Sequence, residues 1–198
     1  SNILIRDKGY QGIIFKLGKN FNKIKLKESF IEVGAGILDV NLSKFAQLNN
    51  IKDFEFYSGI PGSIGGAIKM NAGCFGYETK DCLKNIKTIN SNRNINILTK
   101  ENLNLSYRNS LLPDGDIVLS AKFNYSYGDK EEILNKIKEI KFKRESSQPI
   151  KFKTSGSTFK NPKKNYAAKL IEMSGCKGLN IGDAYVSDKH ANFLINTN

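Results

Sequence analysis

The chain opens with short apolar runs that are separated by glycine and asparagine, a pattern typical of β-strands. Apolar side chains then recur every three or four residues from Leu38 to Leu48. This spacing predicts a helix over residues 37–49 with one buried face. The predicted strands of the first third lie at residues 3–6, 12–17 and 30–33.

A second β-rich region follows residue 85. Its apolar runs at residues 86–89 and 95–98 flank the polar segment 90–94, whose asparagines and serine are typical of a hairpin turn. Alternating apolar and polar residues over 117–125 predict a longer strand. The sequence therefore predicts a hairpin and one further strand in this region.

The pattern changes after Gly128, where we predict a domain boundary. Asp129 and Glu132 have the spacing of an N-terminal capping box, and the isoleucines that follow predict a helix to about Arg144, ended by Gln148-Pro149. Beyond it we expect a loop at residues 155–157, a helix around 166–173, and strands near Tyr185 and Phe193.

Composition favours anionic ligands. The 198 residues include 31 Lys and Arg against 19 Asp and Glu, a formal net charge of +12, and 39% of them are hydrophobic. A general bias toward Lys, Asn and Ile explains most of this charge, because the basic residues are scattered, whereas a nucleic-acid-binding tail gathers them in blocks. Phosphorylated small molecules are therefore the favoured ligands, and no nucleic-acid partner is expected.

A basic nucleic-acid-binding module is nevertheless an alternative function from a different class. Its support is the net charge together with eight tyrosines and twelve phenylalanines. Those aromatic residues fall largely in apolar, strand-like or helical segments, where core packing is their usual role.

The cysteines, the histidine and the hydropathy pattern argue against a zinc protein and against a membrane-spanning protein. Cys74, Cys82 and Cys176 form no Cys-x-x-Cys pair, and His190 is the single histidine, so no zinc-ligand set is recognisable and no metal is expected. Dispersed cysteines fit reduced thiols in a cytosol. Because no apolar run approaches 18 residues, we expect a cytoplasmic protein without membrane insertion. The abrupt ends suggest a piece of a longer polypeptide.

The stretch of residues 59–73 is rich in glycine. Its five glycines are Gly59, Gly62, Gly65, Gly66 and Gly73. Backbone N–H groups without side-chain cover can hold phosphate oxygens, and Gly34-Ala35-Gly36 could supply a second such approach. A structural turn with close helix packing explains the glycines equally well. The stretch is neither a P-loop nor a dinucleotide fingerprint, because it lacks the spacings that those motifs need.

Two polar segments hold candidate catalytic groups. Arg108, in the segment 107–110, carries a planar guanidinium that suits binding an anion or steadying an oxyanion. Ser157 lies on a predicted tight loop, with Lys160 and Asn161 close to it in sequence. For each candidate alone, the ordinary interpretation as a solvated arginine or a turn serine has more support.

Five motifs in order along the chain carry a resemblance to a known family. They are Ser-Asn-Ile-Leu-Ile at residues 1–5, Gly-Ile-Pro-Gly-Ser-Ile-Gly-Gly-Ala at 59–67, Met-Asn-Ala-Gly at 70–73, Tyr-Arg-Asn-Ser at 107–110, and Gly-Ser-Thr-Phe-Lys-Asn-Pro at 156–162. Together they resemble the UDP-N-acetylenolpyruvoylglucosamine reductases, flavin enzymes of bacterial peptidoglycan synthesis. The likeness extends through residues 187–193. The short interval between Tyr125 and Gly156 resembles the short form of the family, which has no inserted tyrosine loop.

The resemblance implies an α+β fold. Residues 1–128 would be a vanillyl-alcohol-oxidase-type FAD-binding domain without its N-terminal subdomain, and 129–198 a smaller α+β substrate-binding domain without its C-terminal segment. The implied reaction passes hydride from NADPH to FAD and then to the enolpyruvyl double bond of UDP-N-acetylglucosamine enolpyruvate, which gives UDP-N-acetylmuramate. We expect a monomer.

The resemblance also assigns residues. Arg108 would stabilise the enolate-like charge, and Ser157 would donate the proton. The implied FAD contacts are Asn2, Gly34, Gly36, Gly59, Ile60, Pro61, Gly62, Ser63, Gly65, Gly66, Asn71, Ala72 and Gly73. The implied substrate contacts are Tyr107, Arg144, Lys160 and Asn161.

The chain departs from the family pattern in three places. The glycine run that precedes the first motif is cut so that only Ser1 and Asn2 remain, and the catalytic glutamate of the family would lie beyond Asn198. Ser147 stands where the family often has lysine. The alternative enzyme class is another FAD-dependent oxidoreductase of the same fold, one that acts on a small hydroxy acid or alcohol.

Overall fold

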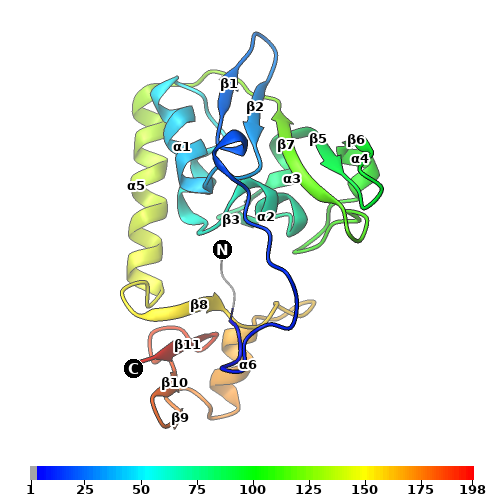
Figure 1. Ribbon diagram of the computed structural model, residues 1–198. Coiled ribbons are helices and arrows are strands. Elements are labelled where there is room, and N and C mark those ends of the chain that lie inside the picture. The colour runs from blue at the N-terminus through cyan, green and yellow to red at the C-terminus, as the bar shows by residue number, and fades with distance from the viewer. Residues whose placement is uncertain (1–3) are drawn as a thin grey trace. The chain divides into compact units, whose positions relative to one another are not determined.

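The computed structural model describes residues 4–198, which divide into two compact units (Figure 1). The first unit contains residues 12–140, and the second contains residues 4–11 together with 141–198. The division falls within helix α5 (Lys130–Ser147), and the domain boundary expected after Gly128 stays a prediction.

A five-stranded antiparallel sheet forms the frame of the first unit. Its strands, in spatial order, are β1 (Ile24–Leu26), β2 (Ile31–Gly34), β7 (Ile117–Phe123), β5 (Leu83–Ile89) and β6 (Ile95–Thr99). Strands β5 and β6 are the hairpin that the sequence predicts, and β2 and β7 are the predicted strands at 30–33 and 117–125. Side chains alternate along β2 and β7, so Ile31 and Val33 lie opposite Phe123 and Ala121 on the buried face.

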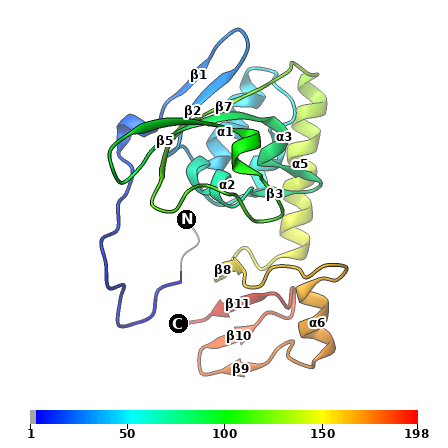
Figure 2. The same ribbon diagram turned by 90° about the vertical axis from the view of Figure 1, so that its right-hand side faces the viewer.

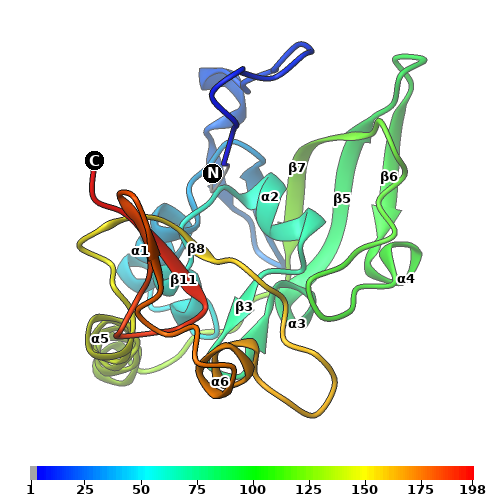
Figure 3. The same ribbon diagram turned by 90° about the horizontal axis from the view of Figure 1, so that it is seen from below.

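Short helices cover that buried face of the sheet (Figures 2 and 3). They are α1 (Asp39–Leu48), the 3-10 helix η2 (Glu55–Gly59), α2 (Ile64–Lys69) and α3 (Thr79–Cys82). The hairpin of β3 (Gly73–Cys74) and β4 (Tyr77–Glu78) lies between α2 and α3 in sequence. Two further short helices are η1 (Lys19–Phe21) and α4 (Lys100–Leu103). Helix α1 confirms the helix predicted over 37–49. Phe54 and Tyr57 pack edge-on against Phe123, which ties η2 to the sheet.

The second unit contains a four-stranded antiparallel sheet and one short helix. Its strands, in spatial order, are β8 (Lys153–Ser157), β11 (Phe193–Asn196), β10 (Ala184–Val186) and β9 (Asn180–Ile181), and the helix is α6 (Ala167–Met173). Helix α6 and strands β10 and β11 confirm the predictions near 166–173, Tyr185 and Phe193.

Helix α5 begins as predicted, because Asp129 Oδ1 accepts hydrogen bonds from the backbone N–H groups of Glu131 and Glu132, both at 2.9 Å.

Two elements differ from the sequence predictions. The predicted strand at residues 12–17 is wrong: Ile13, Ile14 and Phe15 are exposed, and no strand among residues 4–198 pairs with this segment. The predicted loop at 155–157 is also wrong, because these residues belong to β8, which pairs with β11. Gly156, with φ of +86°, gives β8 its irregular register and explains the turn-like composition.

The strand predicted at residues 3–6 lies partly outside the described residues, and residues 4–6 are not in a strand. Within the described chain, no helix combines the length and the apolar content that crossing a bilayer requires.

Candidate functional site

The glycine-rich stretch contains helix α2, which packs against the turn between β2 and α1. The backbone N–H of Ile64 donates to the carbonyl oxygen of Ile37, and that of Gly65 donates to Ala35, both at 2.9 Å. A Cβ at Gly65 would lie 3.3 Å from Ala35. These two N–H groups therefore serve the fold, and the structural interpretation of the glycines holds for Gly65.

Gly34 also owes its identity to close backbone contact, whereas Gly36 faces the end of a side chain that can move. A Cβ at Gly34 would lie 2.0 Å from the carbonyl oxygen of Phe21, and a Cβ at Gly36 would lie 2.3 Å from Asn22 Oδ1. Both distances are far inside van der Waals contact. The structure places the 34–36 turn against α2, where Gly34 is required for close packing, and a phosphate contact by this turn stays a prediction.

Gly66 contrasts with these positions. It is exposed, and a Cβ there would meet nothing nearer than Ser63 Oγ at 3.8 Å. Pro61 is exposed, while Ile60, Gly62 and Ser63 are half-buried. Among residues 59–66, Pro61 and Gly66 are therefore the exposed ones, whereas Gly59 and Ile64 are buried.

A pair of alanine substitutions tests this division of the glycines. Gly34→Ala should lower the free energy of unfolding by about 1–3 kcal/mol, because its methyl group overlaps the Phe21 carbonyl. Gly66→Ala, in a helix and facing open space, should leave it unchanged or raise it by up to about 1 kcal/mol. Urea unfolding of both variants gives the comparison, and equal losses would contradict it.

Asp39 is a site residue that the sequence analysis missed. Its side chain is fully buried in the first turn of α1, and neither carboxylate oxygen has a hydrogen-bond partner among the described residues. A Cβ at Gly62 would lie 2.9 Å from Asp39 Oδ2, so the carboxyl group packs against the glycine-rich stretch. Burial raises the pKa of Asp39 to about 7. The available signal was a polar residue on the apolar face of the predicted helix, one turn before Leu42.

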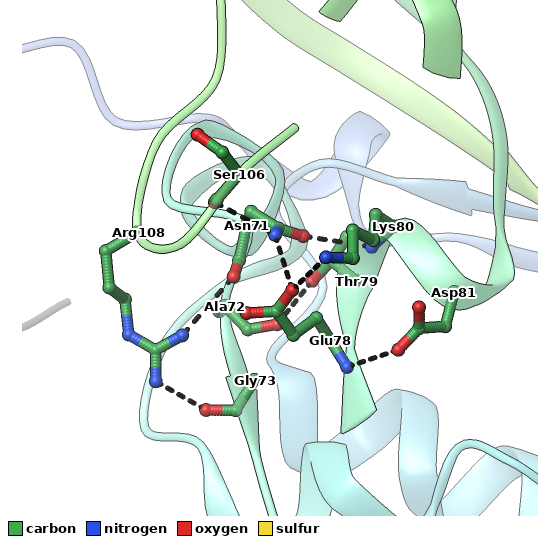
Figure 4. Close-up of polar contacts among 9 residues, drawn as sticks. All are labelled: Asn71, Ala72, Gly73, Glu78, Thr79, Lys80, Asp81, Ser106 and Arg108. Carbon is green, nitrogen blue, oxygen red and sulfur yellow. Dashed lines mark hydrogen bonds and ion pairs between the residues drawn. The ribbon is translucent and has the colours of Figure 1, made fainter. Parts of the chain in front are cut away.

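Arg108 is held against the Met-Asn-Ala-Gly motif (Figure 4). Its Nη2 donates to the carbonyl oxygen of Gly73 at 2.6 Å, and its Nη1 donates to that of Asn71 at 3.4 Å. The guanidinium also stacks on the ring of Tyr107, with its central carbon 5.1 Å from the ring centroid. The structure therefore brings together two predicted catalytic and cofactor motifs that are 35 and 37 positions apart in sequence.

Asn71 organises the same cluster from inside the protein. It is fully buried, has a left-handed backbone with φ of +39°, and uses both ends of its carboxamide. Its Nδ2 donates to Ser106 O at 3.0 Å and to Glu78 Oε2 at 3.1 Å, and its Oδ1 accepts from the backbone N–H of Lys80 at 3.0 Å. Glu78, which the sequence analysis did not single out, thus belongs to the site.

The loop that carries Arg108 is fastened at its far end as well. Ser110 Oγ donates to the carbonyl oxygen of Lys69 at 2.8 Å, and Lys69 Nζ donates to that of Leu112 at 3.2 Å. Helix α2 and the 107–110 loop are therefore one connected structure. Ala72 is half-buried within it, and its carbonyl oxygen accepts from the Thr79 hydroxyl and backbone N–H.

The other predicted site residues lie in the second unit. Ser157 is exposed at the end of β8, opposite Phe193, and Lys160 is exposed in the loop that follows. Asn161 Oδ1 accepts from the backbone N–H of Ala167 at 3.0 Å and so supports the start of α6. Arg144, on α5, donates from Nε to Gln148 Oε1 at 3.2 Å. Asn2 lies outside the described residues.

Two family models match the chain. The model described as "FAD binding domain" matches residues 1–95, and the one described as "UDP-N-acetylenolpyruvoylglucosamine reductase, C-terminal domain" matches residues 148–198. The first ends after β5, and the second covers most of the second unit.

Relatives in other organisms carry the same description over nearly the whole chain. UDP-N-acetylenolpyruvoylglucosamine reductase of Rickettsia conorii is 45% identical over 99% of this chain and 66% of its own length. That of Parvibaculum lavamentivorans is 43% identical over 100% of this chain and 64% of its own. A crystal structure of UDP-N-acetylenolpyruvylglucosamine reductase from Thermus caldophilus has a TM-score of 0.84 at 37% identity, over 92% of this chain and 66% of that one. The chain thus spans slightly less than two thirds of these relatives.

Proposed function

Because this chain belongs to the UDP-N-acetylenolpyruvoylglucosamine reductase family, we propose that it is the greater part of an FAD-dependent UDP-N-acetylmuramate dehydrogenase. The membership confirms the family predicted from the five motifs, and the matched models confirm the α+β class with an FAD-binding domain ahead of the reductase's C-terminal domain. The proposed reaction reduces UDP-N-acetylglucosamine enolpyruvate with NADPH in peptidoglycan precursor synthesis. We propose further that the enzyme is a cytoplasmic monomer.

The open part of the glycine-rich stretch fits an FAD contact. Pro61 and Gly66 are exposed and Ile60, Gly62 and Ser63 are half-buried, and a Cβ at Gly66 would meet nothing nearer than 3.8 Å, so a ligand can reach this part of the chain. The small residues Gly62, Ser63 and Gly66 allow a flat or phosphate-bearing group to approach the main chain closely. Asn71, Ala72 and Gly73, by contrast, are engaged with Arg108, Glu78 and Thr79, so they would act mainly by shaping the site. When bound, FAD supplies the hydride received from NADPH.

The fixed position of the Arg108 guanidinium is the observation that carries the proposal. Its guanidinium is fixed by two backbone carbonyls and one aromatic ring while it remains half-exposed. A guanidinium fixed in this way can face a substrate carboxylate without first losing side-chain freedom. Positive charge at that position stabilises the enolate-like electron density that develops when hydride adds to the enolpyruvyl group.

Ser157 is proposed as the proton donor in the second unit. Its position at the exposed end of β8 leaves the hydroxyl open to a ligand. A free serine is a very weak acid, so it can donate only to a strongly basic carbon, and Lys160, three residues further on, is a candidate to help hold the resulting alkoxide. Arg144, Lys160 and Asn161 are proposed as substrate contacts of the same unit, and Tyr107 as one of the first unit.

A titration with FAD tests the cofactor proposal on this chain. We expect saturable binding with a Kd of about 10 μM or below, followed by flavin absorbance and fluorescence, in a chain that circular dichroism shows to be folded. Gly66→Ala should weaken binding by about tenfold, roughly 1.4 kcal/mol, because its methyl group covers open backbone. A folded chain that does not bind FAD would contradict the proposal for these residues.

The substrate distinguishes the proposal from its alternatives. In a chain lengthened to the size of the relatives, NADPH-dependent reduction of the UDP-sugar enolpyruvate is expected. Oxidation of a small hydroxy acid or alcohol in its place would support the other flavoenzyme class. Oligonucleotide binding with a steep salt dependence, tighter than FAD binding, would support the nucleic-acid module.

A further inference from the structure

Glu78 lies at the centre of the polar cluster around Arg108 (Figure 4). It pairs with Gly73 across the β3–β4 hairpin, and a Cβ on Gly73 would lie only 2.8 Å from the Glu78 Cα. This close pairing fixes the Glu78 backbone beside the residue whose carbonyl oxygen accepts from Arg108 Nη2. The absence of a side chain at Gly73 is therefore what allows Glu78 this position.

The Glu78 carboxylate holds Asn71. Its Oε2 accepts from Asn71 Nδ2 at 3.1 Å and forms an ion pair with Lys80 Nζ at 2.7 Å. Asn71 is fully buried and needs a partner for each of its amide hydrogens, and Ser106 O supplies the other acceptor. These side-chain bonds hold Asn71 in its left-handed backbone conformation. That conformation sets the direction of the Asn71 carbonyl group, which accepts from Arg108 Nη1.

We propose that Glu78 is a positioning residue for Arg108: it fixes Asn71 and Gly73, whose carbonyl groups aim the guanidinium. This inference rests on the proposed function only for the role of Arg108 toward substrate. Asn71 needs the Glu78 side chain as a hydrogen-bond acceptor rather than as a charge. The ion pair with Lys80 is at the surface, with 41% of the Lys80 side chain exposed, and is dispensable for positioning.

The side-chain NMR signals of Arg108 test the inference without FAD or substrate. In this chain the guanidinium held by Gly73 and Asn71 should show slow rotation of its Nη groups, resolved in nitrogen-edited spectra. Glu78→Ala should merge those signals, while Glu78→Gln, which still offers an oxygen to Asn71, should keep them resolved. If Glu78→Ala does not fold by circular dichroism, Glu78→Met takes its place, because it keeps the side-chain length without the acceptor.

Two matched controls separate positioning from loss of charge. Asp81→Asn removes a carboxylate that accepts from the Glu78 backbone N–H at 2.8 Å but does not contact the Asn71 side chain. Lys80→Met removes the ion pair and leaves the Asn71–Glu78 bond in place. Both controls should keep the Arg108 signals resolved. Restrained signals in Glu78→Ala, or merged signals in Lys80→Met, would overturn the inference.

Half-reactions in the lengthened chain test the functional consequence. Glu78→Ala should slow flavin reoxidation by the enolpyruvate by at least about tenfold, because Arg108 is misdirected, and leave flavin reduction by NADPH within about threefold. Glu78→Gln should restore reoxidation to within about threefold. Equal slowing of both half-reactions would indicate a merely structural role and overturn the inference. A wild-type chain that binds FAD but never reduces the enolpyruvate would overturn the proposed function, and the Arg108 spectra would still decide the role of Glu78.

Discussion

Replacing Arg108 with alanine should lower turnover of the enolpyruvate by at least about a hundredfold in a chain lengthened to the size of its relatives. The reason is geometric as well as electrostatic. The guanidinium is held by the carbonyl oxygens of Gly73 and Asn71, so its charge is already in place before substrate binds. The measurement is kcat and KM for NADPH-dependent reduction, with FAD absorbance recorded on the same samples.

Arg108→Lys is the matched control for this prediction. Lysine keeps the positive charge but has no planar fork with which to reach two carbonyl groups, so turnover should lie between wild type and Arg108→Ala. FAD should remain bound within about threefold in both variants, because residues 60–63 and 66 are untouched. Near-normal turnover in Arg108→Ala would contradict the role given to this residue, and loss of FAD would assign Arg108 to the cofactor site.

Local patterns predicted the elements whose stabilising contacts are local. Helix α1 follows from apolar spacing, the β5–β6 hairpin from a five-residue polar turn, and the start of α5 from the cap at Asp129. Strand β8 was missed because its strand character comes from pairing with β11, whose Ile195 lies opposite Thr154. Composition at 155–157 reflects the irregular register, and composition alone cannot distinguish a bulge from a loop.

The same distinction between local sequence patterns and distant contacts applies to the candidate site. The glycine-rich motif was visible in sequence, but phosphate contact and close packing predict the same glycines. Only distances separate Gly34, whose Cβ would overlap Phe21, from Gly66, whose Cβ would meet open space. The Arg108 cluster depends on hydrogen bonds between residues 35 and 37 positions apart, and no periodicity or motif spacing encodes those partners.

Asp39 makes the stability of the first unit depend on pH. Its pKa is 3.8 in an exposed chain and about 7 in the folded protein, because burial disfavours the ionised carboxylate. Between these values the folded state keeps a proton that the unfolded state has lost, so the free energy of unfolding should fall as pH rises from about 4 to about 7 and then level off. The difference of roughly three pKa units corresponds to about 4 kcal/mol for this one group.

Asp39→Asn should remove this slope. Urea unfolding of both proteins at pH 5, 6, 7 and 8 should show the variant gaining on wild type as pH rises, since a carboxamide cannot ionise, while at pH 5 the neutral carboxyl and the carboxamide are nearly equivalent. Asp114→Asn, at an exposed position, is the control and should leave the slope unchanged. Parallel curves for wild type and Asp39→Asn would contradict the assignment.

Because Asp39 Oδ2 packs against Gly62, its neutral form also keeps negative charge away from a loop proposed to contact FAD phosphates. FAD affinity should therefore weaken above pH 7 in wild type and not in Asp39→Asn.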